Sequence, residues 1–231
     1  MERMQSEPSL DTPKAAGGTN GASPGPPGPQ SRSDPGDRGK GKYSAILAIS
    51  GSSVRNLPNT RLFELAIAEI AALEVEFSIL DLHALDLPIY DPDMAERFLP
   101  QGVRVIRQML SAHDGLLIVT PAINGSLPPL LKNALDWSSR PVFGSDALGP
   151  YRHKVAAIMA TARDQAEGAL CLAHLRAVLT IMTVIVLPDA LPVPPKALDG
   201  GPGERSVIAA TRHRVKDLAA ALLPRGPAGR A

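Results

Sequence analysis

From Lys42 onward the chain alternates between short apolar runs and longer amphipathic stretches. Five runs have the length of a strand and cover residues 43–50, 75–80, 115–120, 154–161 and 181–187. Four of them are almost continuously apolar, which is typical of parallel strands covered by helices on both faces. The run at 75–80 alternates apolar and polar residues and therefore predicts an edge strand.

The stretches between and after these runs carry apolar residues at spacings of three and four, the period of a helix that packs on one face. Such stripes cover residues 63–71, 103–110, 127–135, 166–173 and 208–222. Strands that alternate with helices are joined by right-handed crossovers. The pattern therefore predicts an α/β fold, a doubly wound parallel sheet of five strands, with a Pro/Gly-rich connection at 191–203 before the last helix.

The first 41 residues have a different composition. They contain 8 glycines and 7 prolines but only three large apolar side chains. Such a segment cannot bury enough apolar surface to offset the entropy lost on ordering, so we expect a disordered arm at 1–41. The folded domain is expected at 42–223, followed by a flexible tail at 224–231.

The composition argues against several classes of function. The 24 basic and 23 acidic residues leave a net charge of +1, without the basic field that binds nucleic acids. The late apolar stretch at 177–187 is too short to cross a bilayer. The single cysteine, Cys171, rules out an internal disulfide, and no cysteine or histidine spacing matches a zinc site. We therefore expect a soluble cytoplasmic protein without nucleic-acid, membrane or metal partners.

The loop after the first predicted strand combines groups that bind phosphate. In an open α/β sheet, ligands bind beyond the carboxyl ends of the strands, where this loop lies. Ser52 offers a hydroxyl and Arg55 a forked cation. Asn59 and Thr60 suit a helix N-terminus, whose free N–H groups favour an anion. The loop lacks both common nucleotide-binding glycine patterns, and it predicts a phosphate cradle, with a plain helix-capping loop as the alternative.

The loop after the third predicted strand indicates a tight turn at the same edge. Pro121 ends the strand, and Asn124-Gly125 favours a turn with positive φ. Ser126 is predicted to be the N-cap of the following helix. Backbone amides and carbonyls of this turn would hold the polar edge of a flat heterocycle, and a simple capping turn is the alternative.

These two loops, together with the helix that follows the second, match a known family pattern. The matching residues are Gly51-Ser52, Arg55, Asn59-Thr60 and a stretch from Thr120 to Pro141 that contains the block Lys132-Asn133-Ala134-Leu135-Asp136-Trp137. Over residues 42–223 the chain closely resembles the NADPH-dependent FMN reductase family. That family is flavodoxin-like and includes quinone, chromate and azo-dye reductases.

The resemblance implies a flavodoxin-like domain with FMN at the carboxyl edge of the sheet. The residues that match the family's phosphate loop are Ser52, Arg55, Asn59 and Thr60. Those that match its isoalloxazine loop are Pro121, Asn124, Gly125 and Ser126, and Ile123 would pack against the ring. No catalytic side chain is implied, because the flavin supplies the chemistry.

The resemblance also implies an NAD(P)H-dependent oxidoreductase. A hydride would pass from NADPH or NADH to FMN and then to a flavin, a quinone or a similar small acceptor. Family members are usually dimers or tetramers, so a homodimer or homotetramer is expected, in which Trp137 is a core or interface anchor. The preferred nicotinamide, the physiological acceptor and the oligomer size stay open.

Three ligand loops depart from the family pattern. Leu57 stands where a second serine is usual. Ala122 and Ile123 replace an acid and an aromatic residue, and the loop after the fourth strand carries charged residues such as Arg163 in place of glycines. These changes leave an alternative open, a degenerate flavodoxin-like binding or regulatory module with weakened or lost flavin binding.

Other reactive side chains are expected to be structural. Cys171 lies in an apolar helical pattern and is expected to be buried. The five histidines form no pair spaced by four residues, so no histidine metal site is predicted. Asp91 and Asp93 lie among prolines and predict a solvated turn.

Deletion of residues 1–41 should leave the folded domain unchanged, because the arm is expected to bury no apolar surface. We expect the same midpoint of thermal unfolding and the same FMN affinity, measured by scanning calorimetry and fluorescence quenching. A loss of either would mean that the arm takes part in the fold or in the site.

Overall fold

The computed structural model describes residues 45–52, 58–141 and 144–223. All of them belong to the unit formed by residues 41–231. The arm predicted at 1–41, the tail predicted at 224–231, and the residues Arg55 and Leu57 lie outside the described residues.

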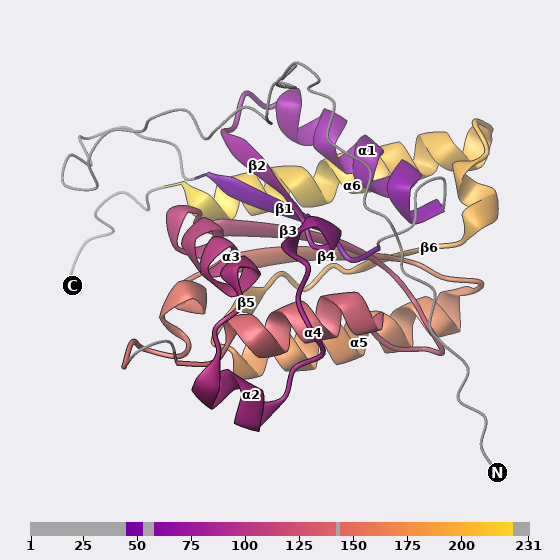
Figure 1. Ribbon diagram of the computed structural model, residues 1–231. Coiled ribbons are helices and arrows are strands. Elements are labelled where there is room, and N and C mark those ends of the chain that lie inside the picture. Colours follow the sequence, from indigo (N-terminus) through magenta and orange to yellow (C-terminus); the bar gives the residue numbers. More distant parts are fainter. Residues whose placement is uncertain (1–44, 53–57, 142–143, 224–231) are drawn as a thin grey trace, which may run out of the picture. The chain divides into compact units, whose positions relative to one another are not determined.

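A parallel sheet forms the centre of this unit (Figure 1). Its strands are β1 (Ile46–Ser50), β2 (Phe77–Asp81), β3 (Gly115–Pro121), β4 (Val155–Thr161), β5 (Ile185–Val186) and β6 (Leu191–Val193). Neighbouring strands follow the order β2-β1-β3-β4-β5, and β6 also pairs with β4. This is the order of the flavodoxin-like doubly wound fold, so the predicted fold class is confirmed. β2 lies at one end of the order, as its alternating sequence predicts.

The other end of the sheet differs from the prediction. Most of the run at 181–187 is not a strand, because α5 (Gln165–Ile181) continues to Ile181 and Thr183 adopts a left-handed conformation with φ of 69°. Only β5 pairs there, with the first two residues of β4. β6 forms where an irregular connection was expected and pairs with the last three residues of β4. Pro192 is tolerated in β6 because, among the described residues, this strand has a partner on one side only.

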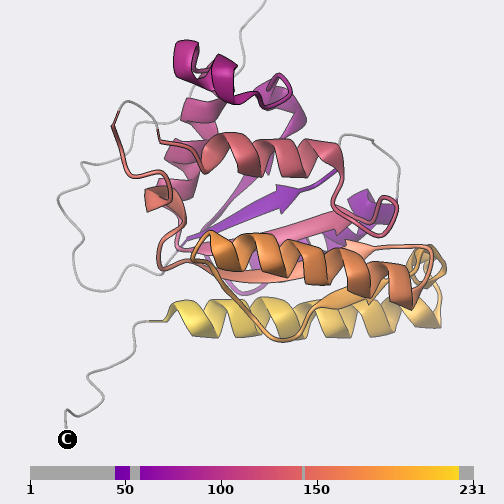
Figure 2. The ribbon, with the colours of Figure 1, turned by 90° about the horizontal axis from the view of Figure 1, so that it is seen from below.

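Helices cover both faces of the sheet (Figures 1 and 2). On one face, α1 (Pro58–Ala71) and α6 (Pro202–Leu222) pack against Ile46 and Ala48 of β1. On the other, α3 (Gln101–Ala112), α4 (Pro129–Ser138) and α5 share one core cluster with Leu47 and Ile49 of the same strand. Burial on both faces explains why the central strands are almost continuously apolar.

All five predicted helices are present, and shorter helical segments join them. The short helix α2 (Pro92–Arg97) and the 3-10 turns at His83–Leu85, Gly149–Tyr151 and Pro195–Leu198 were not predicted. Asp91 is the N-cap of α2 and accepts a hydrogen bond from the N–H of Met94 at 3.0 Å, so the solvated turn predicted here is in fact a helix start. None of the helices in the described part of the chain is long and apolar enough to span a bilayer.

A buried carboxylate ties the start of α1 to the start of α6. The Glu204 side chain is 5% exposed and accepts hydrogen bonds from Nε of Arg61 at 2.9 Å and from the N–H of Gly200. Because Arg61 lies in the first turn of α1, this ion pair holds the N-terminus of the helix at the carboxyl edge of the sheet. The same arginine lies 3.9 Å from Glu64, whose side chain is 61% exposed.

Glu204→Ala should lower the free energy of unfolding by about 1–3 kcal/mol, because it leaves Arg61 and the N–H of Gly200 without their acceptor. Glu64→Ala removes the exposed partner of the same arginine and serves as the matched control. It should change the free energy of unfolding by less than about 0.5 kcal/mol. Denaturant titration measures both variants, and equal losses would contradict the role assigned to the buried carboxylate.

Candidate functional site

The loops after β1 and β3 meet at the carboxyl edge of the sheet. β1 and β3 are adjacent parallel strands, in which Ser50 pairs with Val119. The N–H of Gly51 donates to the carbonyl of Val119 at 2.8 Å. A Cβ at position 51 would lie 2.5 Å from Oγ1 of Thr120, closer than such atoms approach, so glycine is required. Among the described residues, the two loops therefore converge as the sequence predicted.

The loop after β1 leads into the N-terminus of α1. The helix begins at Pro58 and has no acidic residue in its first turn, so Asn59 and Thr60 lie at a helix N-terminus, as predicted. The helix dipole makes this end favourable for an anion. Ser52 and Thr60 are both partly exposed here, whereas Arg55 lies outside the described residues.

Asn59 forms part of the framework beneath this loop. Its side chain is fully buried, and Nδ2 donates to Oγ of Ser50 at 3.1 Å. Its Oδ1 atom is buried without a hydrogen-bond partner among the described residues. The Asn59 side chain therefore lies beneath the loop and shapes it.

Residues 123–126 form a two-residue hairpin turn, here called the 123–126 turn. Ile123 and Ser126 form an antiparallel bridge with two N–H···O bonds of 3.0 Å. Asn124 and Gly125 between them have φ of 52° and 72°, which confirms the predicted positive φ and is typical of a type I′ turn. Ile123 is 45% exposed and Asn124 is also exposed, so the tip of the turn faces outward.

Ser126 does not cap the following helix, contrary to the prediction. α4 begins at Pro129 with Pro128 in the N-cap position. The backbone of Ser126 closes the hairpin, which places the residue before the helix, and the two prolines start the helix without a side-chain cap. The Ser126 hydroxyl instead bonds to Nδ1 of His174 on α5 at 2.7 Å.

One face of α5 lies against this loop. Leu170 reaches to 3.7 Å from where a Cβ on Gly125 would stand. Cys171 is fully buried, as predicted, with Sγ 3.9 Å from the carbonyl of Pro121. Burial raises the pKa of Cys171 to about 11, so the thiol is protonated and is not a nucleophile. The sequence indicated α5 as a core helix but did not reveal that it supports the turn.

The charged residues after β4 pair with each other and cap the start of α5. Asp164 is the N-cap of α5 and accepts a hydrogen bond from the N–H of Glu167 at 2.8 Å. Arg163 pairs with the Glu167 carboxylate, with Nε at 3.1 Å and the backbone N–H at 3.0 Å. These bonds, with a smaller contribution from the N–H of Gly125, lower the pKa of Glu167. The guanidinium of Arg163 remains 84% exposed at the rim of the site.

The most specific sequence block has a structural role in α4. Asn133 accepts from the N–H of Tyr90 at 2.7 Å and donates to the carbonyl of Pro88 at 2.9 Å. Trp137 is buried, and its indole N–H donates to the same carbonyl at 2.7 Å. This block therefore fixes the segment after β2, and Trp137 is the core anchor that the sequence suggested.

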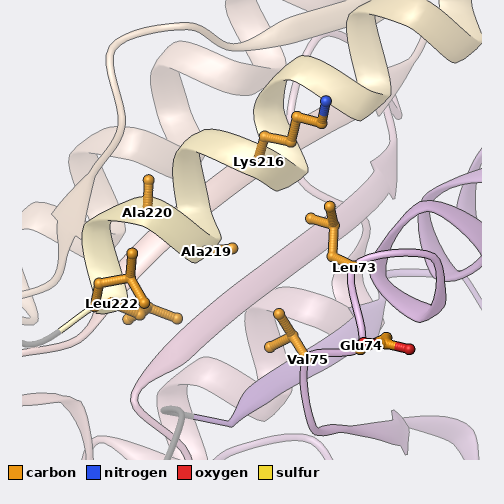
Figure 3. A pocket seen from close by; sticks show the side chains of 8 residues that line it. Leu73, Glu74, Val75, Lys216, Ala219, Ala220 and Leu222 are labelled. Atoms are coloured by element: carbon orange, nitrogen blue, oxygen red, sulfur yellow. The ribbon is translucent and has the colours of Figure 1, made fainter.

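A groove and a cluster of ionisable side chains lie away from the carboxyl edge of the sheet. A groove of about 370 Å³ lies where β2 begins and α6 ends, and Leu73, Val75 and Lys216 are among its lining residues (Figure 3). Asp189, His213 and Asp217 bring possible ligand atoms within 4.8 Å of one another. The guanidinium of Arg214 already interacts with both of these carboxylates, so we assign no metal to them.

The chain is similar to known proteins over most of this domain. A family model described as NADPH-dependent FMN reductase matches residues 44–197, which is more than half of the chain. A 2-hydroxy-1,4-benzoquinone reductase from Burkholderia sp. is 36% identical over 142 residues, covering 62% of this chain and 73% of that protein. A quinone reductase from Escherichia coli (strain K12) is 31% identical over 153 residues, covering 64% of this chain and 68% of that protein.

Solved structures share the fold. A flavoenzyme NAD(P)H:acceptor oxidoreductase from Paracoccus denitrificans has a TM-score of 0.61 at 23% identity, covering 78% of this chain and 98% of that one. This similarity independently supports the flavodoxin-like architecture.

Gly51→Ala should destabilise the carboxyl edge, because the added Cβ collides with Thr120. We expect the free energy of unfolding to fall by about 1–3 kcal/mol. Thr120→Ala removes Oγ1, the atom of closest contact, so the double variant should lose less than the sum of the two single variants. Denaturant titration of the wild type, the two single variants and the double variant measures this coupling. Strictly additive losses in the free energy of unfolding would mean that the two side chains are not in contact.

Proposed function

We propose a binding site for FMN in this chain, which belongs to the NADPH-dependent FMN reductase family and is a flavin oxidoreductase that uses FMN and NAD(P)H. The FMN is held between the loop after β1 and the 123–126 turn. The observation that carries this placement is the contact of Gly51 with Thr120, which brings the two loops to one rim of the sheet. Ligands of open α/β sheets bind at this rim, where the strand order reverses.

The loop after β1 fits the phosphate end of FMN. The N-terminus of α1 is a favourable place for a dianion, and no carboxylate in its first turn opposes it. Ser52 and Thr60 contribute hydroxyl groups, and the buried Asn59, which matches the family's phosphate loop, holds this loop from beneath. Arg55 is assigned to the same phosphate from the sequence match alone.

The 123–126 turn fits the polar edge of the isoalloxazine ring. The backbone groups of Pro121, Asn124, Gly125 and Ser126 lie in or next to the turn, which holds them in a fixed arrangement. The exposed Ile123 supplies an apolar surface against which a flat ring packs. Pre-organised backbone groups of this kind orient a flavin without using any charged side chain.

The bound FMN supplies two-electron redox chemistry between the nicotinamide and the acceptor. The residues of this chain bind the phosphate, orient the ring edge and leave the rim open to a second ring. Close stacking of two rings is the geometric requirement for hydride transfer, so no acid–base pair is needed.

We propose a quinone as the small acceptor, because the relatives named above are quinone reductases. A homodimer or homotetramer is proposed as the working form. This proposal of an oligomer is supported by a cleft of about 470 Å³ lined by Tyr90, Phe98 and Arg140, beside the largely exposed Ile89. We assign the protein to the cytoplasm, since its one cysteine is buried and needs no oxidising compartment.

The purified protein should bind FMN and oxidise NADPH when a benzoquinone is added. Ser52→Asp places a carboxylate beside the proposed phosphate position, so FMN affinity should fall at least about tenfold through like-charge repulsion. Riboflavin lacks the phosphate and should bind almost as before. Fluorescence quenching measures both affinities, and NADPH absorbance follows turnover.

Lys216→Ala, in the groove at the opposite edge, is the matched control and should change neither affinity (Figure 3). Equal weakening of FMN and riboflavin by Ser52→Asp would place the phosphate elsewhere. A protein that binds no flavin and oxidises no NADPH would contradict the function itself and favour a degenerate binding module.

A further inference from the structure

Two polar side chains lie on the face of α5 that contacts the loop after β3. Glu167 and His174 are separated by seven residues, which is two helical turns, so they project on one side of α5. Leu170 and Cys171 lie between them on this face and contact the same loop. The N-terminal half of α5 thus runs alongside the turn (Figure 2).

Glu167 anchors the loop after β4 to the start of α5. Its side chain is only 10% exposed, although it is ionic. Besides the two bonds given above, the carboxylate accepts one from Nη2 of Arg163 at 3.3 Å. Asp164 caps the helix at the N–H of Glu167, so this loop is bound to the first turn of α5.

His174 connects the other end of the turn to the helix. Its Nδ1 atom lies 2.7 Å from Oγ of Ser126, the residue whose backbone closes the hairpin. Either atom donates in this bond according to the tautomer of the ring. The bond fixes the side chain of a residue that the sequence assigned to the flavin.

The contact with His174 adds to the restraint that the backbone bridge gives the turn. Asn124 and Gly125 have positive φ, which Asn-Gly adopts readily in a type I′ turn, so the turn keeps its shape without strain. The tip residues Ile123 and Asn124 are exposed, so burial contributes little to their order. A turn left to fluctuate would lose entropy each time it bound a ring, and that loss weakens binding.

We propose that His174 is a positioning residue that holds the 123–126 turn in the conformation that binds the isoalloxazine edge. This inference rests on the proposed function and adds a residue that contacts the turn rather than the flavin.

The test measures flavin affinity of His174→Ala by fluorescence quenching, with FMN and with riboflavin. This variant should weaken binding by about threefold to tenfold, the loss expected for one hydrogen bond. The factor should be the same for both ligands, because the turn holds the ring and not the phosphate. The absorbance bands of the bound flavin should also shift, since the contacts at its polar edge change.

Two further variants separate positioning from a general effect. His174→Asn keeps a hydrogen-bonding atom close to the position of Nδ1 and should restore most of the affinity. His213→Ala removes an exposed histidine of α6 and should leave affinity and spectrum unchanged.

The outcomes distinguish this inference from the proposed function. If the wild-type protein binds neither ligand, the proposed function fails. If the wild type binds both and the His174→Ala variant binds equally well with an unchanged spectrum, only the positioning role fails. Loss of affinity together with loss of the cooperative unfolding transition of the ligand-free variant also overturns it, because His174 would then stabilise the fold.

Discussion

The close approach of Gly51 to Thr120 determines the geometry of the carboxyl edge. Parallel pairing of β1 with β3 brings the two loops side by side, and the absence of a Cβ at position 51 lets their backbones meet. A larger residue would push the loop after β1 away from the sheet. Every later feature of the site, from the start of α1 to the 123–126 turn, depends on this one contact between two chain segments far apart in the sequence.

The site is supported by elements that carry none of its candidate ligands. Glu204 on α6 bonds to Arg61 in the first turn of α1, and His174 on α5 bonds to Ser126 of the 123–126 turn. Helices from opposite faces of the sheet thus contact the two halves of one rim. In the charged loop after β4, Arg163 and Glu167 pair with each other at the start of α5.

The sequence features differ in what they reveal. The Lys-Asn-Ala-Leu-Asp-Trp block is the strongest family match, yet Asn133 and Trp137 use their polar atoms to anchor the chain at Pro88. The specific sequence of this block therefore indicates the fold. The proposed ligands are mostly backbone groups and small hydroxyls, which leave a weak pattern in any sequence. For Asn59 the pattern indicated the helix start correctly but not that the side chain is buried beneath the loop.

The sequence by itself determined the class of fold, the edge position of β2, the five main helices and the positive φ of Asn124 and Gly125, because periodic burial and turn chemistry are local properties. Only the tertiary structure decided that β6 completes the edge of β4, that Ser126 bonds to His174 rather than capping α4, and that α5 supports the turn. These features arise from contacts between segments distant in the chain, which side-chain spacing within one segment does not encode.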